Sequence, residues 1–266
     1  MNQLTIQCNA LFLTKKELDK LRKLLKKYRT EHMILLVRDT EGIETQKCIG
    51  LIRCALKGVC GIEVLSDDDR SYDEIYEGIT QWSEDVVFSL PKEAMRYAVE
   101  EEIMLDELAR LFVKPKRWIH VQSMTRLTLQ LAKQHGVDLH SARIAGLFHD
   151  CTKKIHGEPA VKLMKQCAKE HLQKPEAVWH QYTGAYWMEH VLQIDNTQAV
   201  EAVRHHVYGD LEEPLAMMVY IADKLDPSRG YDSSQTIALC MDDLRAGFAE
   251  VHRQQDSYLK ETGVLG

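Results

Sequence analysis

Histidine is unevenly distributed along this chain of 266 residues, and its distribution indicates where chemistry could take place. Ten of the twelve histidines lie between residues 120 and 206. An imidazole titrates near neutral pH and also binds divalent metals, so a cluster of histidines fits either metal binding or acid–base catalysis. We therefore expect a functional site within this part of the chain.

Histidine and aspartate residues on three predicted helices narrow this expectation to a metal site. His149 and Asp150 follow the apolar run IAGLF at the end of a predicted helix, where both side chains can reach one ion. His120 lies on the preceding helix, and Asp223 lies within the apolar segment MMVYIADKLD, where a buried carboxylate is costly unless it is paired or bound to metal. A His-Asp pair alone is more often a capping dipeptide, but these four side chains together could converge on one cation.

The elements that must position these residues fall into two regions. Up to about residue 90, short apolar runs alternate with amphipathic segments, which predicts a small parallel α/β layer. The expected strands are LTIQC, MILLV, GIEVL and DVVFSL, and the expected helices are KKELDKLRKLLKKY and TQKCIGLIRCAL. This region is the expected first domain, a small α/β accessory domain over residues 1–92.

From Pro91 onward, apolar residues recur at spacings of three and four, which predicts helices throughout. Gly136 is the expected stop of one helix, Asp138 the expected cap of the next, and Asp195 or Asn196 the cap of another. The helices are expected over residues 93–112, 117–134, 139–152, 158–169, 182–193, 197–207, 213–225 and 235–262. The fold class is therefore mainly α, with an all-helical bundle over residues 93–266 preceded by the small α/β domain.

Composition and charge exclude several classes of protein. The chain is 45% hydrophobic and 28% charged, which is typical of a globular protein. No stretch approaches the roughly 18 to 20 apolar residues of a membrane span, and the first residues lack a secretory signal, so we expect a cytoplasmic protein with no membrane partner. A net charge of −6 argues against general nucleic-acid binding. Seven scattered cysteines without a Cys-x-x-Cys pair fit reduced thiols.

The order His120, His149-Asp150, Asp223 resembles the H…HD…D signature of the HD-domain metal-dependent phosphohydrolases. The resemblance narrows to the YqeK-type branch, the symmetrical diadenosine tetraphosphate hydrolases of bacteria. The segments that carry it are ARIAGLFHDCTKK at 142–154, WHQYTGAY at 179–186, AVRHHVYGD at 202–210 and YIADKLDPSRGYD at 220–232. The similarity thus spans the chain from His120 to about Asp232.

This resemblance implies two adjacent metal sites, with Asp150 able to bridge them. The family metal is typically iron, although manganese suits the same imidazole and carboxylate ligands. The implied first site uses His120, His149, Asp150 and Asp223, and the implied second site adds His180 and His206. Because His205 and His206 are adjacent, only one of them can face inward from the helix, and the sequence leaves that choice open.

The resemblance also implies cationic side chains that act on the substrate. Lys153 matches the lysine that follows the HD pair, where an ammonium could neutralise charge on the phosphate under attack. Arg229 matches an arginine that binds polyphosphate, and Lys224 could assist it. The chain departs from the family pattern at Lys154, where an acidic residue is common, and at Val207, where a threonine is usual.

The ligand set itself supports metal-assisted hydrolysis of a phosphoanhydride, because divalent cations lower the pKa of water and bind phosphoryl oxygens. The resemblance implies the substrate, diadenosine tetraphosphate, which would be cleaved into two ADP molecules by metal-activated water. Two alternatives stay open. One is an HD phosphohydrolase acting on another nucleotide, and the other is a non-catalytic nucleotide-binding or protein-interaction module in which the metal only holds helices together.

The first 92 residues carry a weaker resemblance. In some bacteria this hydrolase follows a nicotinate-nucleotide adenylyltransferase domain, and the segment LPKEAMRYAVEEEIML resembles the end of such a domain. The motifs G-x-F-x-P-x-H-x-G-H and I-S-S-T-x-I-R of that domain are absent. The resemblance therefore implies a shortened remnant without transferase activity. The alternative is an accessory domain that stabilises the hydrolase or mediates pairing, which leaves a homodimer open.

Overall fold

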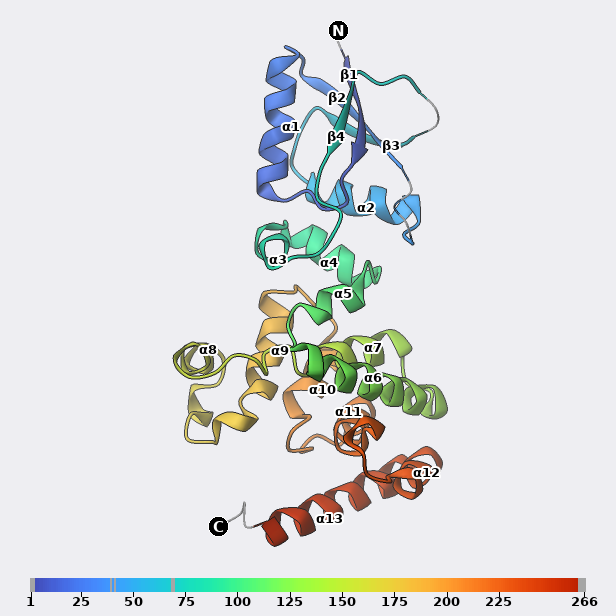
Figure 1. Cartoon of the computed structure of the whole chain (residues 1–266), viewed down its shortest axis with the longest axis vertical. Coiled ribbons are helices and arrows are strands. Elements are labelled where there is room, and N and C mark those ends of the chain that lie inside the picture. Colours follow the sequence, from blue (N-terminus) through green and yellow to red (C-terminus); the bar gives the residue numbers. More distant parts are fainter. Residues whose placement is uncertain (1–2, 39, 41, 68–69, 263–266) are drawn as a thin grey trace. The chain divides into compact units, whose positions relative to one another are not determined.

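The computed structural model describes residues 3–38, 40, 42–67 and 70–262 (Figure 1). The chain forms two compact units. The α/β unit comprises Met1–Leu111 and Val191–Ile194, and the helical unit comprises Phe112–His190 and Asp195–Gly266. The domain division expected between residues 92 and 93 stays a prediction, and in the structure the segment from residue 93 to Leu111 belongs to the α/β unit.

The α/β unit is built on a parallel sheet with the strand order β3-β2-β1-β4. Its strands are β1 (Gln3–Asn9), β2 (His32–Val37), β3 (Ile62–Ser66) and β4 (Glu74–Glu77). Helix α1 (Lys15–Lys27) connects β1 to β2, and α2 (Thr45–Ala55) connects β2 to β3. Strand β2 (HMILLV) is mostly apolar, β1 (QLTIQCN) mixes apolar and polar residues, and most residues of both strands are buried, as expected for parallel strands covered by crossover helices.

The sequence-based prediction was wrong for the last strand of this unit. The run DVVFSL lies in a helix, α3 (Glu84–Ser89), because Ser83 accepts a hydrogen bond from the Val86 amide and two acidic residues occupy the first turn. The fourth strand is instead β4, with the sequence EIYE, which pairs with β1. This strand of four residues with a glutamate at each end is too short to show a clear alternation of polar and apolar residues. Two more helices, α4 (Lys92–Glu100) and α5 (Leu105–Arg110), complete the unit.

The helical unit confirms the predicted all-helical bundle. Two expected long helices are each divided. The helix expected over residues 93–112 is α4 and α5 of the α/β unit, which are separated by positive φ angles at Glu102 and Met104. The helix expected over residues 235–262 is α12 and α13, on either side of Asp243. The helices are α6 (Pro115–His135), α7 (Leu139–Phe148), α8 (Glu158–Cys167), α9 (His180–His190), α10 (Thr197–His205), α11 (Pro214–Leu225), α12 (Ser234–Asp242) and α13 (Leu244–Thr262), with short 3-10 turns η1 (Lys169–His171), η2 (Glu176–Val178) and η3 (Pro227–Arg229).

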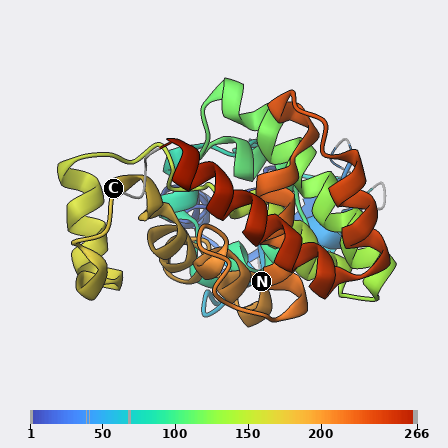
Figure 2. The same ribbon diagram turned by 90° about the horizontal axis from the view of Figure 1, so that it is seen from below.

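Three predicted helix boundaries agree with the structure, whereas α7 ends at Phe148 rather than at residue 152 and α9 spans His180–His190 rather than residues 182–193. Gly136 ends α6 with a φ of 70°, Asp138 caps α7 through the Ser141 amide, and Asn196 caps α10. The last helix, α13, packs against α11 and α12 along the lower side of this unit (Figures 1 and 2). Over the described part of the chain, none of the helices combines the length and the apolar character that crossing a membrane requires.

Helices α6 and α7 approach closely, and this approach places the first two candidate ligands side by side. A Cβ atom added at Gly146 on α7 would lie 2.8 Å from the Thr125 hydroxyl oxygen and 2.9 Å from the Thr125 Cα atom on α6. A larger side chain at position 146 would therefore force the helices apart. His120 lies on α6 and His149 directly follows α7, so the glycine keeps their rings within reach of each other.

Candidate metal centre

His120 projects from α6 into the interior of the helical unit, where it is 7% exposed. Its Nδ1 atom lies 2.7 Å from an oxygen of Asp226, so this nitrogen carries the proton and donates to the carboxylate. The other nitrogen, Nε2, lies 3.2 Å from Nε2 of His149 and 3.2 Å from an oxygen of Asp223. Asp226 thus fixes the ring so that a lone pair of His120 faces the other candidate ligands.

His149 is held in the same way at the end of α7. Its Nδ1–H group donates a hydrogen bond to the carbonyl oxygen of Gly146 at 2.8 Å, and Nε2 faces His120. His149 and Asp150 are both fully buried. One oxygen of Asp150, Oδ2, accepts a hydrogen bond from Arg117 at 2.5 Å. The second oxygen, Oδ1, is buried and has no hydrogen-bond partner among the described residues.

The two remaining candidate histidines complete the cluster from α9 and the end of α10. His180 is the first residue of α9, and His206 follows α10, with their Nε2 atoms 3.1 Å apart. Nδ1 of His206 donates to the Val203 carbonyl at 2.6 Å, so its Nε2 also presents a lone pair. His206 is fully buried, whereas His205 points away and binds Asp210 at 2.6 Å. The structure therefore brings His206, rather than His205, into the cluster.

The ligand atoms form two groups that meet at one carboxylate. His120, His149 and Asp150 offer ligand atoms that all lie within 4.8 Å of one another, and so do Asp150, His180 and His206. Ring nitrogens face each other at 3.1–3.2 Å within each pair of imidazoles. Converging imidazole nitrogens beside a buried carboxylate oxygen that has no hydrogen-bond partner among the described residues are arranged as the ligands of a cation would be. These residues therefore fit one or two divalent cations of the kind that nitrogen and oxygen ligands bind.

The protonation states of the cluster suit metal binding. Burial lowers the pKa of His180 to about 3 and holds the pKa of His206 well below its ordinary value, so both imidazoles are neutral at pH 7. Burial also acts to raise the pKa of Asp150, but His149, His180 and Arg117 outweigh it and hold that pKa well below its usual range. Neutral imidazoles and an ionised carboxylate are the forms that bind metals.

His149 shows most directly that the site favours positive charge. Burial acts to lower the pKa of its imidazole, yet the carboxylates of Asp150 and Asp223 outweigh burial and raise it. The unfavourable transfer of a charged group to the protein interior is therefore compensated at this nitrogen by nearby negative charge. A bound cation would meet the same favourable field.

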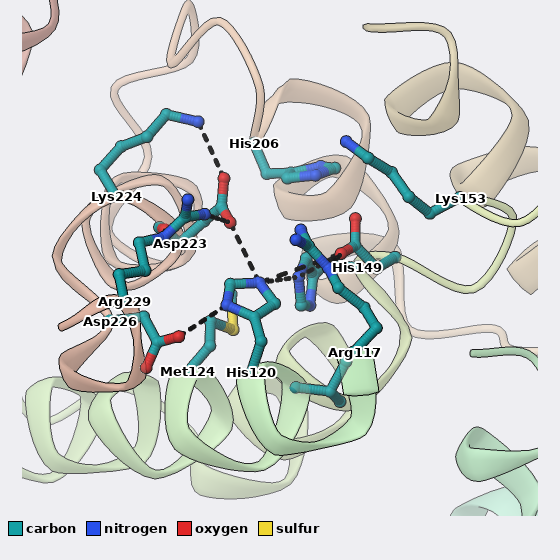
Figure 3. Close-up of polar contacts among 12 residues, drawn as sticks. Arg117, His120, Met124, His149, Lys153, His206, Asp223, Lys224, Asp226 and Arg229 are labelled. Carbon is teal, nitrogen blue, oxygen red and sulfur yellow. Dashed lines mark hydrogen bonds and ion pairs between the residues drawn. The ribbon is translucent and has the colours of Figure 1, made fainter. Parts of the chain in front are cut away.

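Cationic side chains approach the cluster from opposite sides (Figure 3). Lys224 and Arg229 both bind the carboxylate of Asp223, at 2.8 and 2.9 Å. Lys153 comes from the other side, with its Nζ atom 3.0 Å from Nε2 of His180. Burial lowers the pKa of the Lys153 ammonium. The structure thus places the three residues expected to act on the substrate next to the candidate ligands.

Sequence reasoning missed two residues of this site, Arg117 and Asp226. Arg117 lies three residues before His120 on α6, and Asp226 lies three residues after Asp223, just past the end of α11. Each lies within one helical turn of a residue that the sequence had indicated, and this spacing was the feature of the sequence that could have revealed them. Asp226 is fully buried, so its carboxylate needs the hydrogen bonds it accepts from His120 and from the Ser228 amide at 2.9 Å.

A comparison with known protein families identifies this part of the chain. Residues 117–228 match the family model described as HD domain. The chain contains an HD domain. The matched range begins at Arg117 and includes each candidate ligand, Lys153 and Asp226. Because HD domains bind divalent metals, the family assignment agrees with the metal-binding character of the cluster, while the identity of the metal and the role of each residue stay predictions.

Relatives of this HD domain carry names that describe nucleotide hydrolysis. A protein of Mycoplasma genitalium named "Probable nicotinate-nucleotide adenylyltransferase/Ap4A hydrolase" is 25% identical over 167 residues, which cover 60% of this chain and 48% of that protein. A Bacillus subtilis protein named "Bis(5'-nucleosyl)-tetraphosphatase, symmetrical" is 30% identical over 122 residues, which cover 43% of this chain and 63% of that protein. The chain spans about half the length of the Mycoplasma relative that it matches.

A solved structure supports the fold. The chain resembles a predicted HD superfamily hydrolase involved in NAD metabolism from Clostridium acetobutylicum, with a TM-score of 0.53 and 22% sequence identity. The similarity covers 69% of this chain and 90% of the other. It confirms the fold expected for the HD domain.

Proposed function

We propose that this protein is a cytoplasmic enzyme that hydrolyses diadenosine tetraphosphate symmetrically to two molecules of ADP. The observation that carries the proposal is the fully buried Asp150, which belongs to both groups of ligand atoms and has one oxygen without a hydrogen-bond partner among the described residues. The names of the relatives from Mycoplasma genitalium and Bacillus subtilis support the choice of substrate.

The proposed ligands are those that the sequence analysis selected. His120, His149 and Asp150 would hold one cation together with Asp223, which lies 3.2 Å from Nε2 of His120. The second would be held by the remaining imidazoles, His180 and His206, and by Asp150. We propose iron as the metal, with manganese as the alternative. When bound, such cations would make the attacking water more acidic and neutralise charge on a phosphoryl oxygen.

The side chains around the ligands suit a substrate with two equivalent halves. Water attacks one of the two central phosphorus atoms, the bridging P–O bond breaks, and its electron pair leaves with the second ADP. Lys224 and Arg229 lie on the Asp223 side of the cluster, and Lys153 lies on the His180 side. Cations on both sides can bind the phosphates of both halves, so the bond between the two halves would lie at the centre.

For the α/β unit, we propose descent from an adenylyltransferase domain that has lost its activity. The name of the Mycoplasma genitalium relative, which gives two functions, and the parallel β3-β2-β1-β4 sheet support this origin. The absence of both transferase motifs from the sequence supports the loss of activity. The unit would then act as an accessory domain of the hydrolase.

The experiment that tests the proposed function is anaerobic purification of the full chain, followed by metal analysis and an assay of the products formed from diadenosine tetraphosphate. Wild type is compared with His149→Ala and Asp150→Asn, and His205→Ala is the matched control because His205 points away from the cluster. We expect ADP as the only nucleotide product, and we expect both ADP formation and bound metal to be lost in the first two variants but kept in the control.

Two other outcomes would replace this proposal. If wild type binds metal but forms no ADP, a panel of other nucleotides decides between a different phosphohydrolase and a non-catalytic module. If Asp150→Asn lowers only the melting temperature and no nucleotide is turned over by wild type, the metal has a structural role.

A further inference from the structure

We propose that α13 and the segment after η3 form a nucleoside subsite that stacks on one nucleobase of the substrate. The inference rests on the proposed function, which supplies a substrate with two nucleosides. It goes beyond that function because it assigns base recognition to residues outside the matched range 117–228. The proposal follows from a cavity, from the cations that it shares with the metal centre and from the aromatic side chains in its wall.

The cavity has a volume of about 450 Å³. Lys224 and Arg229 line it on the side of α11 and η3, and Tyr231, Gln254, Gln255 and Tyr258 supply other parts of its wall. Its volume lies within the range of roughly 300 to 1,000 Å³ that is typical of small-molecule sites. The cavity is therefore large enough for a nucleoside.

Two side chains connect this cavity with the candidate metal centre. Nζ of Lys224 lies 2.8 Å from one oxygen of Asp223, and a terminal nitrogen of Arg229 lies 2.9 Å from the other. The same two side chains line the cavity. A phosphate bound by these cations would thus have the metal centre on one side and the cavity on the other. A nucleoside joined to that phosphate can enter the cavity.

Tyrosine side chains give the cavity a surface for an aromatic base. Tyr231 is 49% exposed and Tyr258 is 59% exposed, so both rings are accessible to a ligand. The Tyr231 hydroxyl donates a hydrogen bond to the carbonyl oxygen of Lys224, which fixes this ring beside the phosphate-binding cations. Bases stack on exposed aromatic rings in many nucleotide-binding proteins, and the loss of one such ring typically weakens binding by about 5- to 150-fold.

Amide side chains on α13 add groups that can recognise the edge of a base. Gln254 and Gln255 both line the cavity, and an amide offers a hydrogen-bond donor and an acceptor. The Gln254 amide nitrogen is held by Thr236 at 3.0 Å and by Glu250 at 2.8 Å, which orients this side chain. These two bonds use both N–H groups of Gln254, so its side-chain oxygen is the acceptor that it can offer, while the Gln255 amide can offer a donor as well. A purine base carries both donors and acceptors on its edge, so it matches this pair of amides.

A second cavity of the helical unit lacks these features. It has a volume of about 570 Å³ and lies between the start of α10, the start of α11 and the end of α6. Its wall contains the carboxylates of Asp138, Glu201 and Glu213. Carboxylates repel the phosphates of a nucleotide. The larger cavity is thus unsuited to this ligand, and size alone does not decide the assignment.

The test measures binding of ADP and of inorganic pyrophosphate to the full-length protein by calorimetry in the presence of Mn²⁺. The variant Tyr258→Ser removes a ring, and Tyr258→Phe is the matched control that keeps it. We expect Tyr258→Ser to weaken ADP binding by about 5- to 150-fold and to leave pyrophosphate binding unchanged, while Tyr258→Phe binds both ligands like wild type.

The proposal is overturned if Tyr258→Ser binds ADP as wild type does, if it weakens ADP and pyrophosphate equally, or if wild type binds no ADP. A second pair, Tyr231→Leu and Tyr231→Phe, repeats the test on the other ring. Because these measurements need no turnover, they separate the two proposals. If ADP binding depends on the rings but diadenosine tetraphosphate is not cleaved, the proposed function is contradicted and the subsite is kept. If diadenosine tetraphosphate is cleaved but ADP binding does not depend on the rings, the subsite is contradicted and the proposed function is kept.

Discussion

A buried carboxylate of the α/β unit lies outside the candidate site, whereas a buried carboxylate of the helical unit lies within it. In the α/β unit, Glu17 is 2% exposed. One of its carboxylate oxygens accepts a hydrogen bond from the Tyr76 hydroxyl, and the other forms an ion pair with Lys20 at 2.8 Å. In the helical unit, Asp150 is fully buried, and only one of its oxygens has a hydrogen-bond partner among the described residues. Burial of an acid alone therefore does not indicate function, whereas an unsatisfied oxygen facing several imidazoles does.

The surroundings of the two acids explain this difference. Glu17 is near the start of α1, where it has a cation one turn away and a tyrosine hydroxyl from β4. These partners satisfy it without any further group. Asp150 lies 3.4 Å from Nε2 of His149 and 3.3 Å from Nε2 of His180, in a cluster drawn from several helices. The first arrangement stabilises a fold, and the second leaves room for a cation.

The largest expected effect comes from removing the charge of Asp150. The substitution Asp150→Asn keeps the size of the side chain but provides only a neutral oxygen, so we expect ADP formation to fall by roughly 100- to 1,000-fold or more. The check is the rate of ADP formation from diadenosine tetraphosphate together with the metal content. A variant that keeps full metal content and activity would contradict the special role that we assign to this carboxylate.

A smaller effect is expected at Asp226, which contacts His120 rather than the proposed cation. The change Asp226→Asn weakens the hydrogen bond that orients the imidazole, and we expect metal affinity to fall by about 10- to 100-fold. Metal titration monitored by activity measures this shift. Excess metal should restore most of kcat, which distinguishes a positioning residue from a ligand. Failure of excess metal to restore activity would place Asp226 among the ligands.

A substitution of Glu17, the buried acid of the α/β unit, should lower the stability of the protein without affecting the candidate metal centre. Replacement of Glu17 by Gln removes its charge and leaves the Tyr76 hydroxyl with a weaker acceptor, so we expect a loss of about 1–3 kcal/mol in the free energy of unfolding. Urea denaturation measures this loss, and metal analysis of the folded variant should give the wild-type content. A drop in metal content would show that the two buried acids are not independent.

The smallest effect concerns two buried thiols. Burial raises the pKa of Cys8 in the α/β unit to about 11, and it also raises the pKa of Cys151 beside Asp150, so both thiols are protonated and slow to react at pH 8. Chelation of metal should accelerate labelling of Cys151 by up to about 10-fold and leave Cys8 unchanged, because only the helical unit loses a bound ion. Mass spectrometry of the labelled protein measures both labelling rates. If chelation accelerates the labelling of Cys8 and Cys151 equally, the contrast between the two units is contradicted.

Apolar periodicity and residue type predicted His120, His149, Asp150 and Asp223, whereas the resemblance to the HD family supplied the other candidate residues. The positions of His149 and Asp150 after an apolar run and of Asp223 within one were visible without coordinates. Periodicity could not choose between His205 and His206, since adjacent residues point in different directions and only the packing of α10 decides which side is buried. Nor could it show Asp226, whose importance depends on a contact with α6.

The fold was predictable to a similar extent. Strong apolar runs gave β1, β2 and β3, and helical periodicity gave the bundle. The prediction failed at α3 and β4, where short segments carry mixed signals. The apolar letters of DVVFSL suit a strand, but the cap at Ser83 starts a helix, and β4 is recognisable mainly through its pairing with β1. Local sequence does not contain the pairing partner, which only tertiary structure supplies.

The absent side chain of Gly146 also bears on the spacing of two candidate ligands. The glycine lets α7 lie against the Thr125 backbone, and the facing nitrogens of His120 and His149 are thereby 3.2 Å apart. The separation of those nitrogens depends on how the two helices touch, so a larger side chain at position 146 would move the two imidazoles apart. The spacing of two candidate ligands thus depends on a residue that is not itself a candidate ligand.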